Sequence, residues 1–463
     1  MLEQKVAMDV LDAALSTGGD FAEIFMEDRR SNNLILQSKR LETVNSGRIH
    51  GAGIRVYVGL NAIYAYTNDT DREGLLRCAK QAASAVRECK NGIVHAKPFV
   101  IAQTSNIHPV KHAPCATDTR RKVDVLREAN DAARAISDEI SQVVCNYRDS
   151  EQDVVICNSD SLYVTDKRIY SRMSCMAVAG SESENQMGHD APGALKGFEL
   201  FLENIDPKTI GRNAAETAVK MLHALVCPAG VMPVVIDNGF GGVIFHEACG
   251  HSLEATSVAF GTSEFTGKLG QQIAATCVTA IDDGTLPNEW GSENVDDEGT
   301  KTTRLVLIEN GILKNYMIDR LNGKRMGMPP TGSARRESYA YAPTSRMRNT
   351  YIAAGKDEND EIIATMGDGL YAAKLGGGSV NPATGEFNFA VNEGYLVKNG
   401  KITTPVRGAS LIGKGAEVLQ RIDRVGKNMT MAQGMCGSLS GSVPTNVGQP
   451  MIRVSTMTVG GRA

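Results

Sequence analysis

Two histidines flank a glutamate in the segment 246–251, and their spacing is the strongest chemical signal in the chain. His246, Glu247 and His251 form the pattern HExxxH, one residue longer than the HExxH zinc helix. Only eight histidines occur in 463 residues, so this pairing beside a carboxylate indicates a metal site. Residues five apart on a regular α-helix point about 140° away from each other, too far for one small ion. The spacing therefore predicts a bulged helix, such as a single π-type turn with its i→i+5 bond, and Gly250 makes that distortion easier.

A catalytic zinc ion usually has three protein ligands and an open position for water, so a third ligand is needed. Glu254 follows His251 by three residues and can reach the same face, whereas Cys249 lies inside the motif and can face the core instead. Cys436 is far downstream, in the sequence GMCGS, where small neighbours let backbone and metal approach closely. The residues alone leave Cys436, Glu254 and an unidentified Asp as candidates.

The elements that must position these residues are predicted from periodicity and turn signals. An apolar strand at 232–236 and a glycine-rich loop at 237–242 precede the motif, and Asn-Gly pairs at 310–311 and 399–400 predict two later hairpins. Another hairpin is expected around 59–60. Helices are predicted at 4–16, 71–88, 120–137 and 204–225, and strands at 21–26, 33–37, 142–149, 152–158, 161–171 and 174–181.

This pattern predicts an α+β protein, with a mixed α/β N-terminal region and a sheet-rich C-terminal catalytic domain that carries the distorted HExxxH helix. We expect three domains: an N-terminal α+β domain over 1–110, a central α+β domain over 111–228 and a C-terminal domain over 229–463 that carries the metal.

Composition narrows the functional class. The net charge is −4 and the pI is near 6.1, which argues against a general nucleic-acid binder. No apolar run reaches the roughly 18 residues that cross a bilayer, so no membrane contact is expected. The ten cysteines are scattered without a CxxC pair, which predicts reduced thiols in a cytoplasmic protein.

The chain resembles the TldD/PmbA family, specifically its metal-bearing TldD branch, over essentially its whole length. The matching segments are 239–251, 283–287, 290–292, 296–300, 331–332, 335–340, 349–351, 376–378, 434–437 and 447–450. This resemblance implies a zinc peptidase whose metal ligands are His246, His251 and Cys436. One departure is visible, because Ser333-Ala334 replaces the Asn-Gly that usually precedes the arginine pair, and this change could alter the cleft wall.

From the ligand set we expect Glu247 to act as general base on a metal-bound water and then to carry the proton to the leaving amine. The resemblance also implies short or unfolded peptides as substrates, and a homodimer or a heterodimer with a metal-free PmbA/TldE-like homologue. Arg336 and Tyr339 are candidate substrate contacts, and Gly377 could let a peptide lie against a strand edge. A salt-bridged arginine, a packing tyrosine and a tight turn are the plainer interpretations of these residues.

Two rival functions fit the same sequence. The first is a non-catalytic regulatory or assembly subunit with a structural zinc, which a fourth ligand such as Glu254 would favour. The second is a metal-dependent hydrolase that acts on a non-peptide amide.

Overall fold

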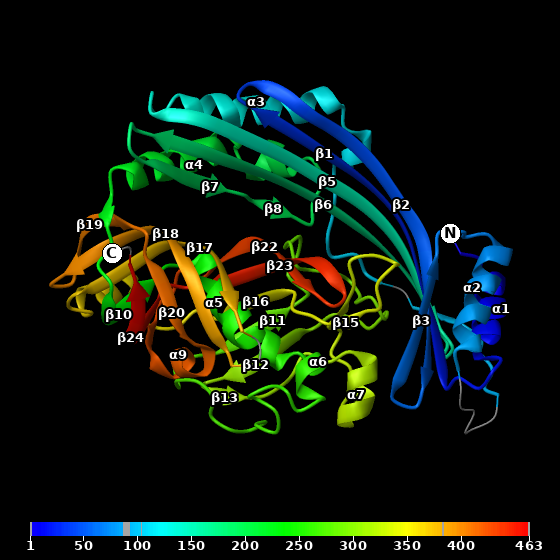
Figure 1. Ribbon diagram of the computed structural model, residues 1–463. Coiled ribbons are helices and arrows are strands. Elements are labelled where there is room, and N and C mark those ends of the chain that lie inside the picture. The colour runs from blue at the N-terminus through cyan, green and yellow to red at the C-terminus, as the bar shows by residue number, and fades with distance from the viewer. Residues whose placement is uncertain (1, 87–92, 103, 382–383, 462–463) are drawn as a thin grey trace.

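The N-terminal half of the chain forms one large sheet that arches over the C-terminal half (Figure 1). The computed structural model describes residues 2–86, 93–102, 104–381 and 384–461. The strands of this sheet run in the order β3-β2-β1-β5-β6-β4, and β7 and β8 also pair with β6. They are β1 (Phe21–Gln37), β2 (Arg40–Val58), β3 (Asn61–Thr67), β4 (Val100–Ile101), β5 (Ile140–Asn158), β6 (Leu162–Gly180), β7 (Asn185–Asp190) and β8 (Gly193–Ala194).

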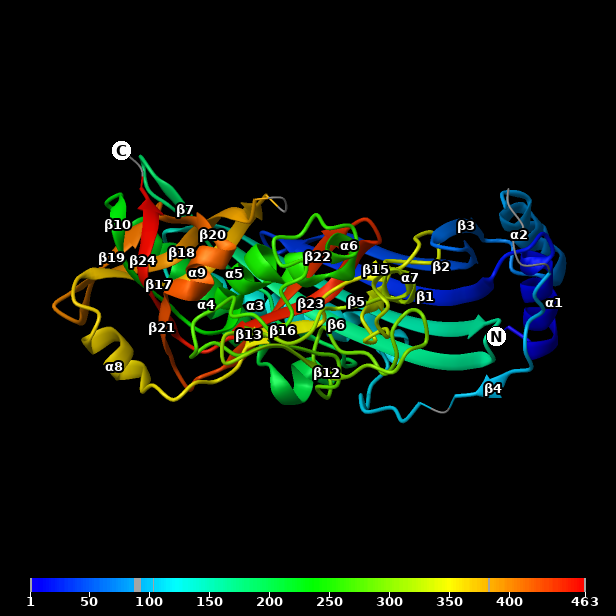
Figure 2. The same cartoon turned by 90° about the horizontal axis from the view of Figure 1, so that it is seen from below.

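Two helix pairs cover opposite ends of the sheet face that points away from the C-terminal half. The first pair, α1 (Gln4–Leu15) and α2 (Arg72–Ser84), packs on Ile24, Ile54 and Cys157. The second pair, α3 (Thr119–Arg134) and α4 (Pro207–Leu222), packs on the other ends of β1, β5 and β6. Figure 2 shows that the first pair lies at one end of an elongated molecule, opposite α8. No helix in the described part of the chain is long and apolar enough to span a membrane.

The strands are longer than the sequence predicts. The segments expected as separate strands at 21–26 and 33–37 are the two ends of β1, and β5 and β6 each unite two predicted strands. The predicted interruptions were wrong because the middles of these strands are polar, as in 29–33 and 148–152, and polar runs resemble turns. In the structure the ladder of β1 and β5 continues without a break from Glu23↔Asn158 to Gln37↔Val144.

The C-terminal half holds two further sheets. The first runs β17-β10-β24-β20-β18-β19-β9 with β21 on β24, and the second runs β13-β12-β11-β16-β23-β22. The strands are β9 (Leu225–Val226), β10 (Gly230–Ile236), β11 (Ala280–Asp283), β12 (Arg304–Glu309), β13 (Ile312–Leu313), β16 (Asn349–Ile352), β17 (Gly369–Val380), β18 (Glu386–Lys398), β19 (Lys401–Arg407), β20 (Ser410–Lys414), β21 (Ile422–Val425), β22 (Thr430–Ser438), β23 (Gly441–Gln449) and β24 (Ile452–Gly460). A small pair, β14 (Ala334–Arg335) and β15 (Thr344–Ser345), lies beside them.

Short helices connect these sheets and carry the HExxxH motif. They are the 3₁₀ turn η3 (Gly239–Gly242), α5 (Val243–Phe245), the π-helix η4 (His246–Gly250), the 3₁₀ turn η5 (His251–Leu253), α6 (Ala255–Val258), α7 (Arg320–Met326), α8 (Asn359–Ala364) and α9 (Gly415–Arg421). The mixture of helix and sheet agrees with the predicted α+β class. The predicted Asn-Gly hairpin turns are confirmed: Asn310 and Asn399 have φ of 49° and 48°, and the glycine after each is also positive.

A network of buried charges joins the N-terminal sheet to the C-terminal half. Arg55 on β2 bonds Glu23 at 2.8 Å and Glu298 at 2.5 Å, and Arg336 bonds Glu23 at 2.9 Å. Arg168 on β6 bonds Asp297 at 2.7 Å. In the acidic run 296–298, Asp297 and Glu298 are therefore buried and each pairs with an arginine of the N-terminal sheet.

Candidate metal centre

The HExxxH segment contains the distortion that its spacing predicts. Residues His246–Gly250 form a π-helix, and the N–H of His251 donates to the carbonyl of His246 in an i→i+5 bond. The wide turn brings the two imidazoles to one side, with ring centroids 5.1 Å apart. The prediction of a bulged helix is therefore confirmed.

Gly250 assists this turn through its size. Its backbone is in the ordinary right-handed helical region, with φ of −56°, so the distortion does not use a special glycine conformation. A Cβ at this position would lie 2.2 Å from the Sδ atom of buried Met347. Gly250 therefore lets the chain after β15 pack directly against the wide turn.

Cys436 reaches the two histidines from β22, at the edge of its sheet. Its Sγ atom lies 3.3 Å from Nε2 of His246 and 3.4 Å from Nε2 of His251. The potential ligand atoms of His246, His251 and Cys436 all lie within 4.8 Å of one another. Among the described residues, these three form a group that could hold a metal ion. A tetrahedral zinc ion with bonds of about 2.0–2.3 Å would hold nitrogen and sulfur ligands about 3.5 Å apart. The donor set and its spacing therefore fit such an ion.

The electrostatics of this group favour a thiolate. Burial would raise the pKa of Cys436, but the His246 and His251 imidazoles beside it hold that pKa at about 3. Cys249 inside the motif behaves oppositely, because it packs in the core and burial raises its pKa well above the ordinary value. Cys249 thus faces the core, as one interpretation of the sequence expects.

Glu254 contacts the opposite nitrogen of the His251 ring. Its Oε2 lies 3.2 Å from Nδ1, which directs Nε2 toward Cys436. Such a carboxylate fixes the ring orientation and tautomer of a metal-binding histidine. Glu247 is more exposed, at 30% of its side chain, and its Oε2 lies 3.7 Å from Nε2 of His251. Its carboxylate therefore borders the side of the ring that faces the potential metal.

Two residues that sequence reasoning missed hold β22 in place. The buried Arg346 donates to the carbonyl of Cys436, and also to the Ser440 hydroxyl at 3.0 Å. Trp290 donates from Nε1 to the carbonyl of Gly434 at 2.8 Å. The only tryptophan of the chain was a usable signal, whereas nothing near Arg346 in the sequence points to Cys436.

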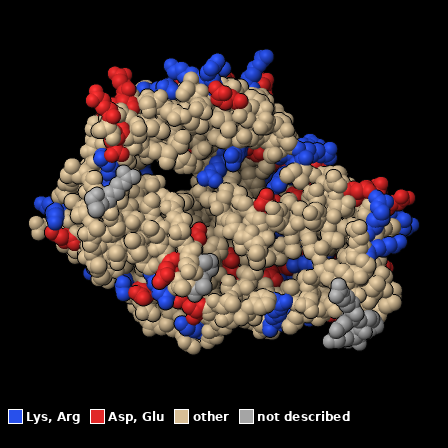
Figure 3. Space-filling view, in the orientation of Figure 1, with Lys and Arg blue, Asp and Glu red and all other residues tan. Residues whose placement is uncertain are grey.

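A cleft of about 390 Å³ lies between the N-terminal sheet and the hairpin β22–β23. The polar middles of β1, β5 and β6 form one wall, and Met435, Val443 and Pro444 of the hairpin form part of the other. Figure 3 shows a hollow between the two halves of the molecule, with Lys and Arg side chains at its upper edge. Met435, which lines this cleft, is the neighbour of Cys436 on β22.

The candidate substrate contacts have different surroundings. The guanidinium of Arg336 is fully buried and bonds Glu23, so in this structure it holds the fold together. Tyr339 packs edge-on against Tyr66, in agreement with the plainer interpretation of a packing tyrosine. Gly377 is exposed in β17, and a Cβ there would meet no atom within 4 Å. The departure at Ser333-Ala334 is buried and is not among the residues that line the cleft.

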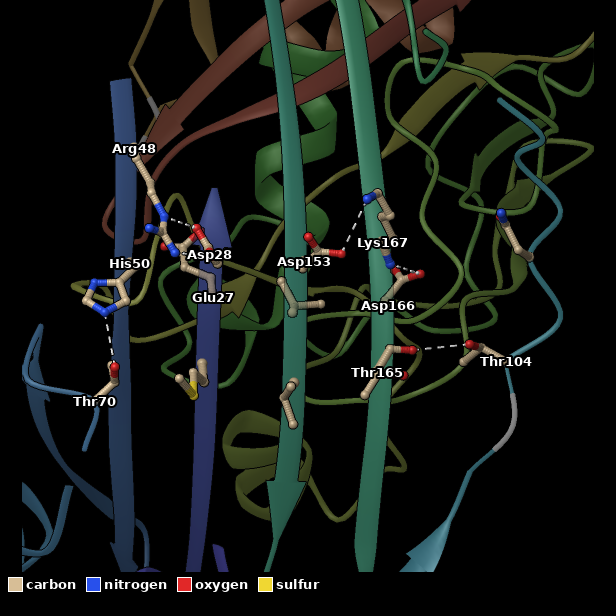
Figure 4. A pocket seen from close by; sticks show the side chains of 14 residues that line it. Glu27, Asp28, Arg48, His50, Thr70, Thr104, Asp153, Thr165, Asp166 and Lys167 are labelled. Carbon is tan, nitrogen blue, oxygen red and sulfur yellow. Dashed lines mark hydrogen bonds and ion pairs between the residues drawn. The ribbon is translucent and has the colours of Figure 1, made fainter. Parts of the chain in front are cut away.

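A larger pocket, of about 650 Å³, lies on the helix-bearing face of the N-terminal sheet, away from the potential metal ligands (Figure 4). Its charged side chains already pair with one another: Arg48 with Asp28 at 2.6 Å and Lys167 with Asp153 at 3.7 Å. His50 bonds Thr70 at 3.0 Å. The pocket is therefore large, but these charged side chains and the histidine already have partners within it.

Three family models match this chain in succession. They describe PmbA/TldA metallopeptidase domain 1, matched by residues 22–86, the central domain, by 113–222, and the C-terminal domain, by 229–461. The C-terminal match contains all three potential metal ligands.

Similar proteins agree over nearly the full length. The metalloprotease TldD homolog of Haemophilus influenzae is 33% identical over 99% of this chain and 97% of its own. That of Buchnera aphidicola from Acyrthosiphon pisum is 34% identical over 96% and 93%. The crystal structure of TldE from Thermococcus kodakarensis shares the fold, with a TM-score of 0.77 and 19% identity over 98% of this chain and 100% of that one. The chain therefore belongs to the PmbA/TldD family of metallopeptidases.

Proposed function

We propose that this protein is a zinc-dependent peptidase that hydrolyses short or unfolded peptides, with His246, His251 and Cys436 as metal ligands and Glu247 as the residue that activates water. The observation that carries the proposal is the convergence of two imidazole nitrogens and one thiolate sulfur, 3.3 and 3.4 Å apart, from segments remote in sequence. Histidine nitrogen and cysteine sulfur are both zinc ligands, and three protein ligands leave a position open for water, as in catalytic zinc sites.

The residues around the ligands suit hydrolysis. When bound, zinc polarises a carbonyl group and lowers the pKa of water. Glu247 is partly exposed beside the ligand group, so its carboxylate can accept a proton from the attacking water and deliver it to the leaving amine. Glu254 keeps the His251 ring oriented through Nδ1 and does not occupy the ligand side.

The arrangement favours this proposal over a subunit with a structural zinc. A structural site usually has four protein ligands, and Glu254 was the nearest candidate for the fourth. Its carboxylate instead contacts the His251 nitrogen that points away from Cys436. A hydrolase for a non-peptide amide would use the same residues, and only substrate tests separate it from a peptidase.

We also propose a cytoplasmic location and a dimer, either of two copies or with a metal-free PmbA/TldE-like homologue. All nine cysteines in the described chain are free, which suits a reducing compartment. Relatives of this fold include TldE, so co-purification from the native host distinguishes the two kinds of dimer.

The proposal is tested with Glu247→Gln, which removes the carboxylate and keeps its size. We expect zinc content to remain at the wild-type level while cleavage of unstructured peptides falls at least 100-fold, in the range for loss of a general base. Glu264→Gln is the matched control, because Glu264 is partly buried nearby and contacts none of the three ligands in the described bonds. Retained turnover in Glu247→Gln, or loss of zinc, would contradict the role of Glu247, and chelator-insensitive cleavage would contradict the need for metal.

A further inference from the structure

Two arginines lie directly opposite each other on the cleft wall. Arg148 of β5 and Arg172 of β6 are register partners, and both line the cleft between the N-terminal sheet and the hairpin β22–β23. Like charges directly opposite on neighbouring strands destabilise a sheet. A fold that keeps this pair therefore contains a concentrated positive charge at this point of the cleft.

Neither arginine has a carboxylate partner among the described ion pairs. Arg148 donates from Nε to Asn33 at 3.1 Å, and Arg172 donates to the carbonyls of Ala191 at 3.2 Å and Gln433 at 3.0 Å. Arg168, Arg335 and Arg336, which also line the cleft, differ because each bonds a buried carboxylate. Arg29 also lines the cleft without an acid partner among the described ion pairs, since it donates to the Glu337 carbonyl at 3.1 Å, but it does not lie opposite a second arginine. Arg148 and Arg172 are thus two arginines that face each other on the cleft wall, with guanidinium nitrogens that bond no acid among the described residues.

Arg172 is buried beside a second positive charge, and this placement disfavours its own charged form. Burial, and then the charge of Arg148, lower the pKa of Arg172 to about 10. His189 of β7 is close enough that burial and the charge of Arg172 lower its pKa as well. An anion placed between these side chains would relieve their mutual repulsion. A guanidinium matches a carboxylate in particular, since it can donate two parallel hydrogen bonds.

We propose that Arg148 and Arg172 form a subsite that binds a carboxylate of the peptide substrate, so that the enzyme prefers peptides with an acidic side chain or a free C-terminus near the cleaved bond. This inference rests on the proposed peptidase function. Arg172 contacts Gln433, three residues before Cys436 on the same strand. At about 3.4 Å per residue this is a distance of about 10 Å, so the carboxylate belongs two to four residues from the cleaved bond.

The test compares four otherwise identical fluorogenic peptides: all neutral with a C-terminal amide, neutral with a free C-terminus, and amidated with one Glu or one Gln three residues from the expected bond. We expect one carboxylate-bearing peptide to have a KM roughly tenfold or more below that of its neutral match, as for loss of a charge-assisted hydrogen bond. The Glu peptide identifies an acidic side chain as the ligand, and the free C-terminus identifies a terminal carboxylate. Equal KM values for all four would overturn the proposal.

Arg148→Gln and Arg172→Gln should each abolish the difference in KM between the preferred carboxylate-bearing peptide and its neutral match. Arg172→Lys keeps the positive charge but cannot donate two parallel hydrogen bonds to a carboxylate, so it should retain part of the preference. Arg127→Gln on exposed α3 is the matched control and should behave as the wild type. A preference that persists in both Gln variants overturns the assignment to these arginines.

Binding separates this proposal from the peptidase function itself. Fluorescence anisotropy with the same labelled peptides on Glu247→Gln protein needs no turnover. If no peptide is cleaved by the wild type but the acidic one binds more tightly than its Gln match, the subsite stands and the peptidase function fails. Equal binding of these two peptides would contradict the carboxylate subsite and leave the peptidase function untouched.

Discussion

The contact between Glu254 and His251 allows a quantitative test of the proposed metal site. The Glu254 side chain is 4% exposed and bonds Nδ1 at 3.2 Å, but it makes no capping bond to α6. Glu254→Ala therefore removes mainly the support of the histidine ring. Loss of a hydrogen bond to a charged group costs about 1.5–3 kcal/mol, and each 1.4 kcal/mol is roughly tenfold in an equilibrium constant. We expect the zinc dissociation constant to rise about 10- to 100-fold, the usual range for such supporting groups.

Competition with a chromophoric chelator at fixed pH measures this constant. Glu254→Gln keeps an oxygen acceptor for Nδ1, so its loss should stay below about tenfold, and Glu264→Gln should match the wild type. Unchanged zinc affinity in Glu254→Ala would refute the supporting role. A loss in Glu254→Gln as large as that of a ligand variant such as Cys436→Ser would show that Glu254 itself binds the metal, as the structural-zinc function requires.

Two further predictions concern packing and pH. Gly250→Ala places a methyl group against Met347, so it should lower the free energy of unfolding by about 1–3 kcal/mol and weaken zinc binding. In thermal unfolding, adding Met347→Val should restore part of this stability. If the losses from the two substitutions simply add, the clash is contradicted. Burial would raise the pKa of Glu393, but hydrogen bonds and charges, chiefly from Lys220, lower it to about 2. Since this folded-state pKa lies below the unfolded value of about 4.5, the stabilisation is present above pH 4.5 and is lost as the pH falls toward 2. Glu393→Gln should therefore destabilise by about 1–2 kcal/mol at pH 7 and progressively less in acid; a constant difference between pH 7 and 3 in denaturant titrations would contradict this.

The distorted helix and the hairpins could be predicted from the sequence because their causes are local. Two histidines five residues apart can bind one ion only if the helix contains a wide turn. Asn-Gly pairs readily adopt the positive φ values that tight hairpins need. The proximity of Cys436 to these histidines has no such local cause. It depends on how β22 packs against the HExxxH segment, so the residues alone left Cys436 as one of three candidates and the resemblance to a family selected it.

The cleft was hidden from sequence reasoning for a related reason. The polar middles of β1 and β5 resemble breaks between short strands, because strands are recognised by apolar alternation. These middles are polar because they line a cavity on one face of the sheet and lie between the two helix pairs on the other. Arg336 presents a further difficulty, since a buried arginine with a partner on another strand cannot be told from an exposed one by sequence alone.

The buried ion pairs between the N-terminal sheet and the C-terminal half determine whether either half could fold if the chain were divided. Cutting the chain near residue 228 would leave Glu298 without Arg55 and Asp297 without Arg168. Removing one partner of a buried ion pair typically costs about 3–5 kcal/mol, and two such losses approach the whole stability of an ordinary domain. The C-terminal half, which carries the potential metal ligands, is therefore not expected to fold on its own. Truncations and insertions should keep the residues on both sides of these buried ion pairs.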